Sequence, residues 1–124
     1  MGQGHFKRAV ADAYRYRCAV TRSATFPSLE AAHIQSFADG GAHVVSNGLL
    51  LRTDVHRLYD RGYLSIDGDL RLRVSPQLRN YGWNGIEFYE REAAGFTIAA
   101  PDDPSKRPDR EALAWHFENK FRAA

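Results

Sequence analysis

The sequence predicts one α+β domain over residues 1–124, built from mostly short elements. Apolar residues recur at helical spacing near both ends of the chain, which predicts a terminal helix at each end. Between them, residues 64–74 alternate between apolar and polar side chains, as a β-hairpin does. Short apolar runs at 29–34 and 49–52 predict two further strands on either side of a glycine-rich loop.

The composition is that of an ordinary globular protein, with 44% hydrophobic and 26% charged residues. Its single cysteine, Cys18, excludes an intramolecular disulfide and a Cys-x-x-Cys zinc site, as expected for a cytoplasmic protein. No apolar run is long enough to span a bilayer, so no membrane partner is expected. The abrupt glycine-rich start suggests a fragment of a longer chain.

A helix is predicted over residues 5–17, because Phe6, Val10 and Tyr14 share one face while charged residues occupy the other. A Phe-Pro-Ser turn then leads into the buried strand at 29–34.

A second helix, a short one, is predicted over residues 55–61, after the glycine loop at 38–43 and the strand at 49–52. Thr53 or Asp54 is the expected N-cap, and the following glycine at 62 is the expected stop.

The hairpin at 64–74 is expected to turn at Asp67-Gly68, since a tight two-residue turn requires positive φ angles. Beyond it lie an aromatic-rich stretch at 81–89 and an extended segment at 96–101. The last helix is expected to begin at residues 108–109 and to align Leu113, Phe117 and Phe121.

The candidate site lies where the first strand ends and the short helix begins. His33 ends the strand, His56 lies in the first turn of the helix, and Asn47 occupies the Ser46-Asn47-Gly48 turn between them. Because strand, loop, strand and helix follow one another, the two imidazoles are expected to converge. Two converging imidazoles can bind a metal ion and activate a water.

The remaining histidines have simpler interpretations. His116 lies in the last helix beside a tryptophan, and His43 is a residue of the glycine loop that could contact substrate but is more simply a loop residue.

Three segments together resemble the HNH endonuclease family: Leu-Glu-Ala-Ala-His at 29–33, Ser-Asn-Gly-Leu-Leu-Leu-Arg at 46–52 and Asp-Val-His-Arg-Leu-Tyr-Asp-Arg-Gly at 54–62. They are most similar to its restriction-endonuclease-like branch with the signature AAHI…NGLLL…HRLFDRG. The resemblance extends to the opening and closing segments. It implies a ββα-metal (His-Me finger) core at about 18–62, with an added β-hairpin and flanking N- and C-terminal helices.

The resemblance also implies roles for the three site residues. His33 would be the general base, Asn47 would hold the loop so that His33 faces the substrate, and His56 would be a metal ligand. The alternatives are a buried His33 that is hydrogen-bonded to backbone, and a His56 that merely packs or contacts phosphate.

One departure from the family pattern concerns the metal. Many members carry Asp or His directly before the base, where this chain has Ala32. Asp60 is the preferred replacement, because it lies four residues after His56 on the same helix face. The alternative is a salt bridge from Asp60 to Arg57 or Arg61, or a hydrogen bond that closes the helix end.

Other carboxylates are weaker candidates. Strand alternation points Glu30 away from His33, and Asp54 is the expected N-cap. One divalent metal ion is expected, Mg²⁺ or Mn²⁺ in preference to Zn²⁺, Ni²⁺ or Co²⁺.

DNA, double-stranded rather than single-stranded, is the expected partner. Arg52, Arg57 and Arg61 flank the site and suit backbone phosphates, whereas the net charge of +2 is only mildly basic. Target specificity is expected from an attached domain or a homodimer.

The expected function is metal-dependent hydrolysis of DNA phosphodiester bonds, leaving 5′-phosphate and 3′-hydroxyl ends. The first alternative is a catalytically inactive nucleic-acid-binding module of HNH fold, which Ala32 favours. The second is an assembly domain that never meets nucleic acid.

Overall fold

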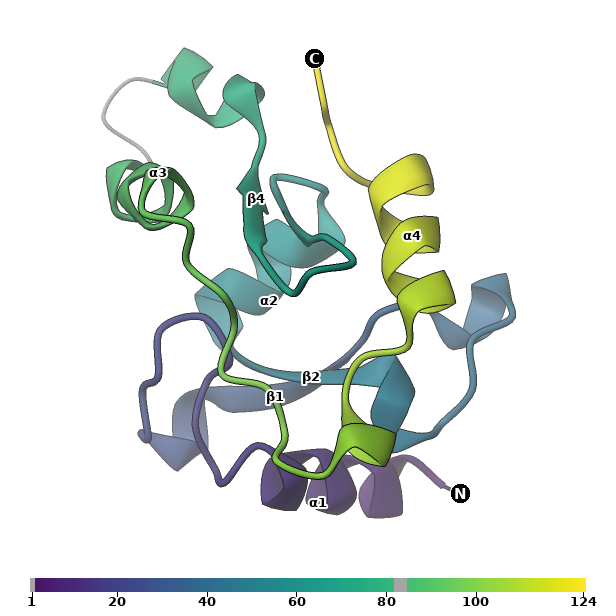
Figure 1. Ribbon diagram of the computed structural model, residues 1–124. Coiled ribbons are helices and arrows are strands. Elements are labelled where there is room, and N and C mark those ends of the chain that lie inside the picture. Colours follow the sequence, from purple (N-terminus) through teal and green to yellow (C-terminus); the bar gives the residue numbers. More distant parts are fainter. Residues whose placement is uncertain (1, 82–84) are drawn as a thin grey trace.

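Two antiparallel two-stranded ribbons organise the chain, and each is covered by helices (Figure 1). The computed structural model describes residues 2–81 and 85–124. Its helices and strands, in chain order, are α1 (Gln3–Ala13), β1 (Leu29–His33), β2 (Gly48–Arg52), α2 (Thr53–Asp60), β3 (Leu64–Ile66), β4 (Leu72–Val74), α3 (Ile86–Ala93) and α4 (Arg110–Asn119). Among the described residues, no helix has the length and apolarity needed to cross a membrane.

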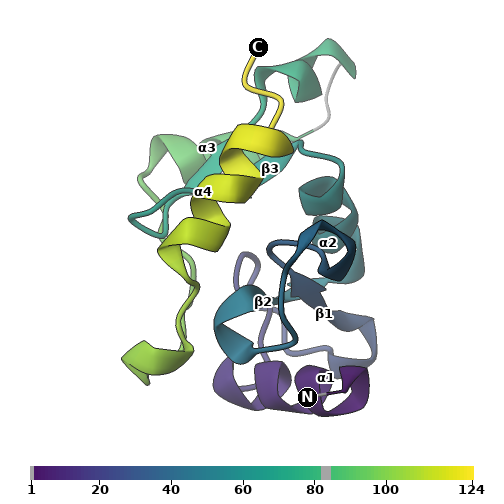
Figure 2. The ribbon, with the colours of Figure 1, turned by 90° about the vertical axis from the view of Figure 1, so that its right-hand side faces the viewer.

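The first ribbon, β1–β2, lies between α1 and α2 (Figure 2). Its register pairs Leu29 with Arg52 and His33 with Gly48. A Cβ at Gly48 would lie 2.6 Å from Val10 Cγ2, so the glycine lets α1 approach the strand closely. The Tyr14 hydroxyl donates to the Gly48 carbonyl at 2.9 Å and fixes that approach. The strand–strand–helix order expected for a ββα core is confirmed.

The predicted helix over 5–17 is too long at its C-terminal end. The helix ends at Ala13, and Arg15 and Tyr16 have positive φ angles of 56° and 58°. Two consecutive left-handed residues cannot continue a right-handed helix.

The start of α2 also differs from the prediction. Its N-cap is Arg52, and neither Thr53 nor Asp54 caps it. Asp54 instead accepts two hydrogen bonds from the Arg52 guanidinium, at 2.7 and 2.9 Å. The expected stop is confirmed, because Gly62 directly follows the C-cap with φ +79°.

The second ribbon, β3–β4, is the predicted hairpin, but the prediction of its turn is wrong. The strands pair Leu64 with Val74 and Ile66 with Leu72, so the loop runs over 67–71. The positive φ angle falls on Leu70, at 63°. The Asp67 carboxylate accepts from the backbone N–H groups of residues 69 and 71, which stabilises this longer loop.

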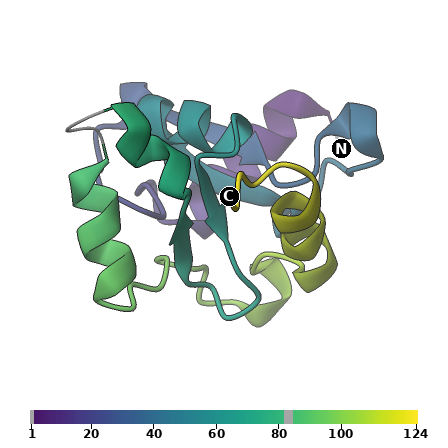
Figure 3. The same ribbon diagram turned by 90° about the horizontal axis from the view of Figure 1, so that it is seen from above.

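The hairpin is flanked by α3 on the side of β4 and by α4 on the side of β3 (Figure 3). The aromatic-rich stretch at 81–89 contributes the first turn of α3, and its residues 82–84 lie outside the described part. The segment 96–101 is extended and makes one bridge, between Thr97 and Arg71. Asp109 caps α4 by accepting from Ala112 N–H, and Phe121 lies beyond the end of this helix.

Candidate functional site

A pocket of about 280 Å³ lies at the junction of α1, β1 and α2. Helix α1 passes beneath the ribbon and α2 follows the second strand, so three separate parts of the sequence meet there. Its lining residues are Gln3, Phe6, Lys7, Glu30, Ala31, His33 and His56. The structure therefore brings the two predicted histidines into the lining of one pocket.

His33 is held between two aromatic contacts. Its ring stacks on Phe6, with 4.2 Å between ring centroids and 6° between planes, and its Nε2 lies 2.8 Å from Nδ1 of His43. Burial, followed by the nearby charges of His43 and His56, lowers the pKa of His33. A lowered pKa keeps the imidazole neutral at pH 7, which is the form that can accept a proton.

Asn47 is buried and uses its whole amide group. Its Oδ1 accepts from Gln35 N–H at 2.9 Å, and its Nδ2 donates to the carbonyls of Gln35 and Ala42 at 2.8 and 2.9 Å. Its own carbonyl accepts from Ile34 N–H. These bonds join the two ends of the loop that follows His33, so the Asn47 side chain holds the backbone on which the imidazole depends.

His56 contacts two carboxylates, one with each ring nitrogen. Its Nδ1 lies 2.8 Å from Glu30 Oε1, and its Nε2 lies 3.1 Å from Asp60 Oδ2. The hydrogen bond to Asp60, and then that to Glu30, raise the pKa of His56 against the opposing effect of burial. Asp60 thus lies next to His56, as the helical spacing predicts.

Strand alternation gives the wrong expectation for Glu30. Glu30 pairs across the ribbon with Leu51, and α2 begins two residues further along, at Thr53. The helix therefore lies over this end of the strand, and the long Glu30 side chain reaches His56.

A second pocket of about 330 Å³ adjoins the first, since both are lined by Glu30 and His56. Its other lining residues are Thr53, Arg57, Asp60 and Arg61. Arg57 and Arg61 are exposed here. The third predicted arginine, Arg52, lines neither pocket, because its guanidinium is bound to Asp54.

Three residues of the site do not follow from the sequence motifs. Strand alternation predicts that Glu30 points away, Lys7 belongs to a helix distant in sequence, and the glycine loop predicts no more than a plain loop residue at His43. The basic character of the first helix was the one available signal for Lys7. Nothing in the sequence indicates the contact between His43 and His33.

The donor set suits a divalent cation, since it combines an imidazole nitrogen of His56 with the carboxylates of Glu30 and Asp60. Within residues 2–81 and 85–124, no three such side chains have the spacing of a preformed metal site. The carboxylates are hydrogen-bonded to the imidazole instead. Metal binding would have to replace at least one of those hydrogen bonds. Ala32 is fully buried and contributes nothing to the pocket.

Comparisons with known proteins bear on the family and the fold of the chain. Residues 18–67 match the family described as HNH endonuclease. A solved structure titled "Modification dependent TagI restriction endonuclease" is similar in fold, with a TM-score of 0.62 and 22% sequence identity. The match covers 92% of this chain and 36% of that one, so this chain spans about a third of its length. A search of curated proteins gives no significant match.

Proposed function

We propose that this chain, which contains an HNH endonuclease domain at residues 18–67, hydrolyses phosphodiester bonds in DNA with the help of a divalent metal ion. One observation supports this most directly: β1 and α2 bring His33, Glu30 and His56 into the lining of one pocket. A neutral imidazole beside carboxylates that can hold a cation is what water-dependent phosphodiester hydrolysis requires.

In the proposed mechanism, His33 takes a proton from a water molecule, and the water oxygen attacks phosphorus in line with the leaving 3′-oxygen. As the new bond forms, the bond between phosphorus and the 3′-oxygen breaks and that oxygen takes a proton from solvent, so the products are a 5′-phosphate and a 3′-hydroxyl. Asn47 keeps the backbone around His33 in place, and a displacement of about 1 Å can cost on the order of a hundredfold in rate.

His56 and Asp60 would hold the metal ion, together with Glu30. When bound, the ion supplies electrostatic stabilisation of the charge that develops on the leaving oxygen. Mg²⁺ or Mn²⁺ is preferred, with Zn²⁺, Ni²⁺ and Co²⁺ as alternatives, because carboxylate oxygens dominate the donor set.

Lys7, Arg57 and Arg61 line the two pockets and are proposed to bind backbone phosphates of double-stranded DNA. Such contacts carry no sequence information, so we attribute target choice to an attached domain or a second copy of the chain. A concerted double-strand cut would need two copies. The single free thiol, Cys18, suits a reducing compartment such as the cytoplasm.

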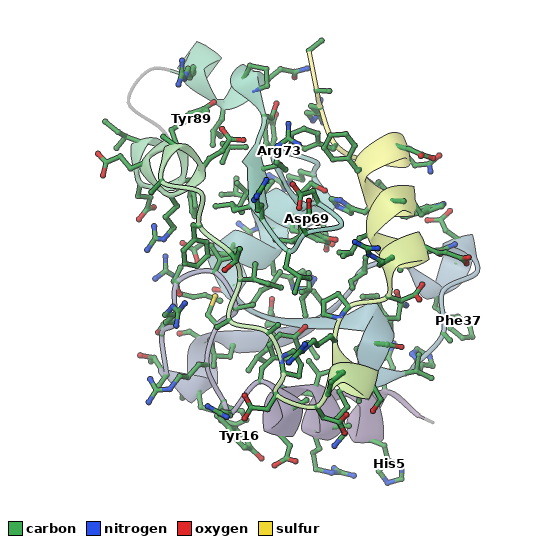
Figure 4. All side chains as sticks on the ribbon, viewed as in Figure 1. His5, Tyr16, Phe37, Asp69, Arg73 and Tyr89 are labelled. Carbon is green, nitrogen blue, oxygen red and sulfur yellow. The ribbon has the colours of Figure 1, made fainter. Side chains whose placement is uncertain are left out.

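A plasmid-nicking assay with Mg²⁺, Mn²⁺ or Ni²⁺ tests the proposal. His33→Ala should lower the cleavage rate about 10²- to 10⁴-fold, the usual contribution of a general base. It should leave salt-sensitive DNA binding in place. His5→Ala, an exposed histidine on α1 labelled in Figure 4, is the matched control.

Two results would contradict the proposed nuclease function. Equal cleavage by His33→Ala and the unchanged protein would remove His33 from the chemistry. DNA binding without cleavage under every metal condition would favour the inactive binding module. Thermal denaturation of each variant shows whether a loss of activity is merely a loss of folding.

A further inference from the structure

His33 and His43 form a hydrogen-bonded pair of imidazoles that the motifs do not predict. Their nitrogens are 2.8 Å apart, their ring centroids 4.9 Å, and their planes cross at 60°. Each ring also stacks on a phenylalanine: His33 on Phe6, and His43 on Phe37 with 4.5 Å between centroids and 5° between planes. The pair is therefore oriented from both sides.

The donor in this hydrogen bond determines what His33 can do. Two neutral imidazoles share one proton between the facing nitrogens, Nε2 of His33 and Nδ1 of His43. If His43 donates, His33 carries its own proton on Nδ1 and has no free lone pair. If His33 donates, its Nδ1 keeps a lone pair, and no described residue forms a hydrogen bond with that atom.

We infer that His43 is a positioning residue for His33, accepting its Nε2–H so that Nδ1 is left to take the proton from water. The inference rests on the proposed function, in which His33 is the general base. The same hydrogen bond gains strength once His33 is protonated, because a charged donor then faces a neutral acceptor. An orienting partner of this kind is a recurring requirement of histidine bases.

The loop geometry favours this role over a direct contact with DNA. The loop residues that carry His43 are tied down by Asn47, whose Nδ2 donates to the carbonyl of Ala42, directly before His43. A Cβ at Gly41 would lie 1.8 Å from the Gln35 carbonyl oxygen, so this glycine lets the loop close tightly. The outer face of His43 is covered by Phe37, which projects at the edge of the molecule in Figure 4.

Three variants of the full chain test the inference. His43→Phe keeps a ring that can stack on Phe37 but has no acceptor for the Nε2–H of His33. His43→Ala removes both the ring and the acceptor. His43→Asn restores an acceptor oxygen near the position of Nδ1. We expect kcat for plasmid nicking to fall about tenfold to a hundredfold in the Phe and Ala variants with KM nearly unchanged. His43→Asn should recover most of that activity.

The ¹⁵N shifts of the His33 ring give a readout that does not depend on cleavage. Unchanged protein and His43→Asn should show protonated Nε2 and unprotonated Nδ1, whereas His43→Phe should show a mixture of tautomers. If the nuclease is inactive but the tautomer still depends on residue 43, the proposed function fails while the positioning contact stands.

Other outcomes overturn the inference itself. The first is a His33 tautomer that is the same in all variants. The second is a change confined to the KM for plasmid nicking, which would indicate a DNA contact. The third is a folded His43→Asn protein that recovers no activity.

Discussion

His116 is a buried histidine whose two ring nitrogens are both hydrogen-bonded inside the core. Its Nε2 donates to the Tyr59 carbonyl at 2.9 Å, so its Nδ1 accepts from the Ser65 hydroxyl at 2.8 Å. Its ring stacks on Tyr59, with 3.8 Å between centroids. The neutral imidazole satisfies both partners, which gives this residue a structural role and fits its expected place in the last helix.

We predict that His116 makes the fold less stable in acid. Burial lowers its pKa to about 4, whereas in the unfolded chain it titrates near 6.5. The unfolded state therefore binds the proton first as the pH falls. The free energy of unfolding should drop by about 3 kcal/mol between pH 6.5 and 4 from this residue alone.

Urea unfolding at several pH values measures this effect. His116→Gln should flatten the pH dependence over that interval, although the variant is less stable at pH 7. His5→Gln, at an exposed position, should leave the dependence unchanged. A His116→Gln protein with the same pH dependence as the unchanged chain would show that the residue does not titrate as described.

At the same scale, the sequence predicts some residues of the candidate site and misses others for a physical reason. His33, Asn47 and His56 follow from local position, at a strand end, in a turn and in a first helical turn. Glu30 and His43 enter the site through tertiary contacts, with His56 and His33. Neither contact has a fixed spacing in the sequence.

At the scale of elements, the candidate metal site combines one strand with one helix. Glu30 lies on β1, and His56 and Asp60 lie one turn apart on α2. The site therefore depends on how α2 packs against the ribbon as well as on helix spacing.

We predict that Glu30→Gln and Asp60→Asn each weaken binding of Mn²⁺ by at least about tenfold, since losing even an outer-shell partner of a metal site costs about tenfold to a hundredfold. Titration calorimetry measures this without DNA. Asp54→Asn is the matched control, because that carboxylate lies on the same helix but binds Arg52.

The two variants also distinguish a metal site formed by His56 and Asp60 from one that includes Glu30 as well. If Asp60→Asn weakens binding and Glu30→Gln does not, the ion is held by His56 and Asp60, as the helical spacing of these two residues predicts. If neither variant changes Mn²⁺ affinity relative to Asp54→Asn, the ion binds elsewhere and the proposed metal site is wrong.

Elements were predictable where side-chain periodicity decides them, and less so where backbone conformation does. The apolar alternation at 64–74 correctly predicted the hairpin β3–β4. Its turn was wrong, because the Asp67 carboxylate stabilises a longer loop and Leu70 takes the positive φ angle. The end of α1 was missed for a similar reason, since nothing in the composition of Arg15 and Tyr16 indicates a left-handed backbone.

At the scale of the whole molecule, the distribution of charge matters more than its sum. The net charge of +2 alone is too small to predict a polyanionic partner. Folding nevertheless brings Lys7 from α1 and Arg57 and Arg61 from α2 into the linings of two adjoining pockets. Lys7 lies 50 residues before Arg57 and 54 before Arg61 in the chain, so its grouping with them is a consequence of the fold.

We predict that this grouping dominates DNA affinity. Replacing all three residues with Gln should weaken binding of double-stranded DNA. It should also reduce the slope of log K against log salt by about 0.9 for each phosphate that the variant no longer neutralises. Fluorescence anisotropy at several salt concentrations measures both quantities. The matched control replaces Arg15, Lys106 and Arg110 with Gln, which removes the same charge from residues that line neither pocket.

Comparing the two triple variants separates phosphate binding at the pockets from the general attraction between DNA and a positively charged protein. If general attraction dominates, the two triple variants should lose affinity equally, since each lowers the net charge by three. If phosphates bind at the pocket, only the first variant should show the reduced slope, and its cleavage rate at saturating DNA should fall less than its affinity. Equal slopes in both variants would contradict the assignment of Lys7, Arg57 and Arg61 as the phosphate-binding residues.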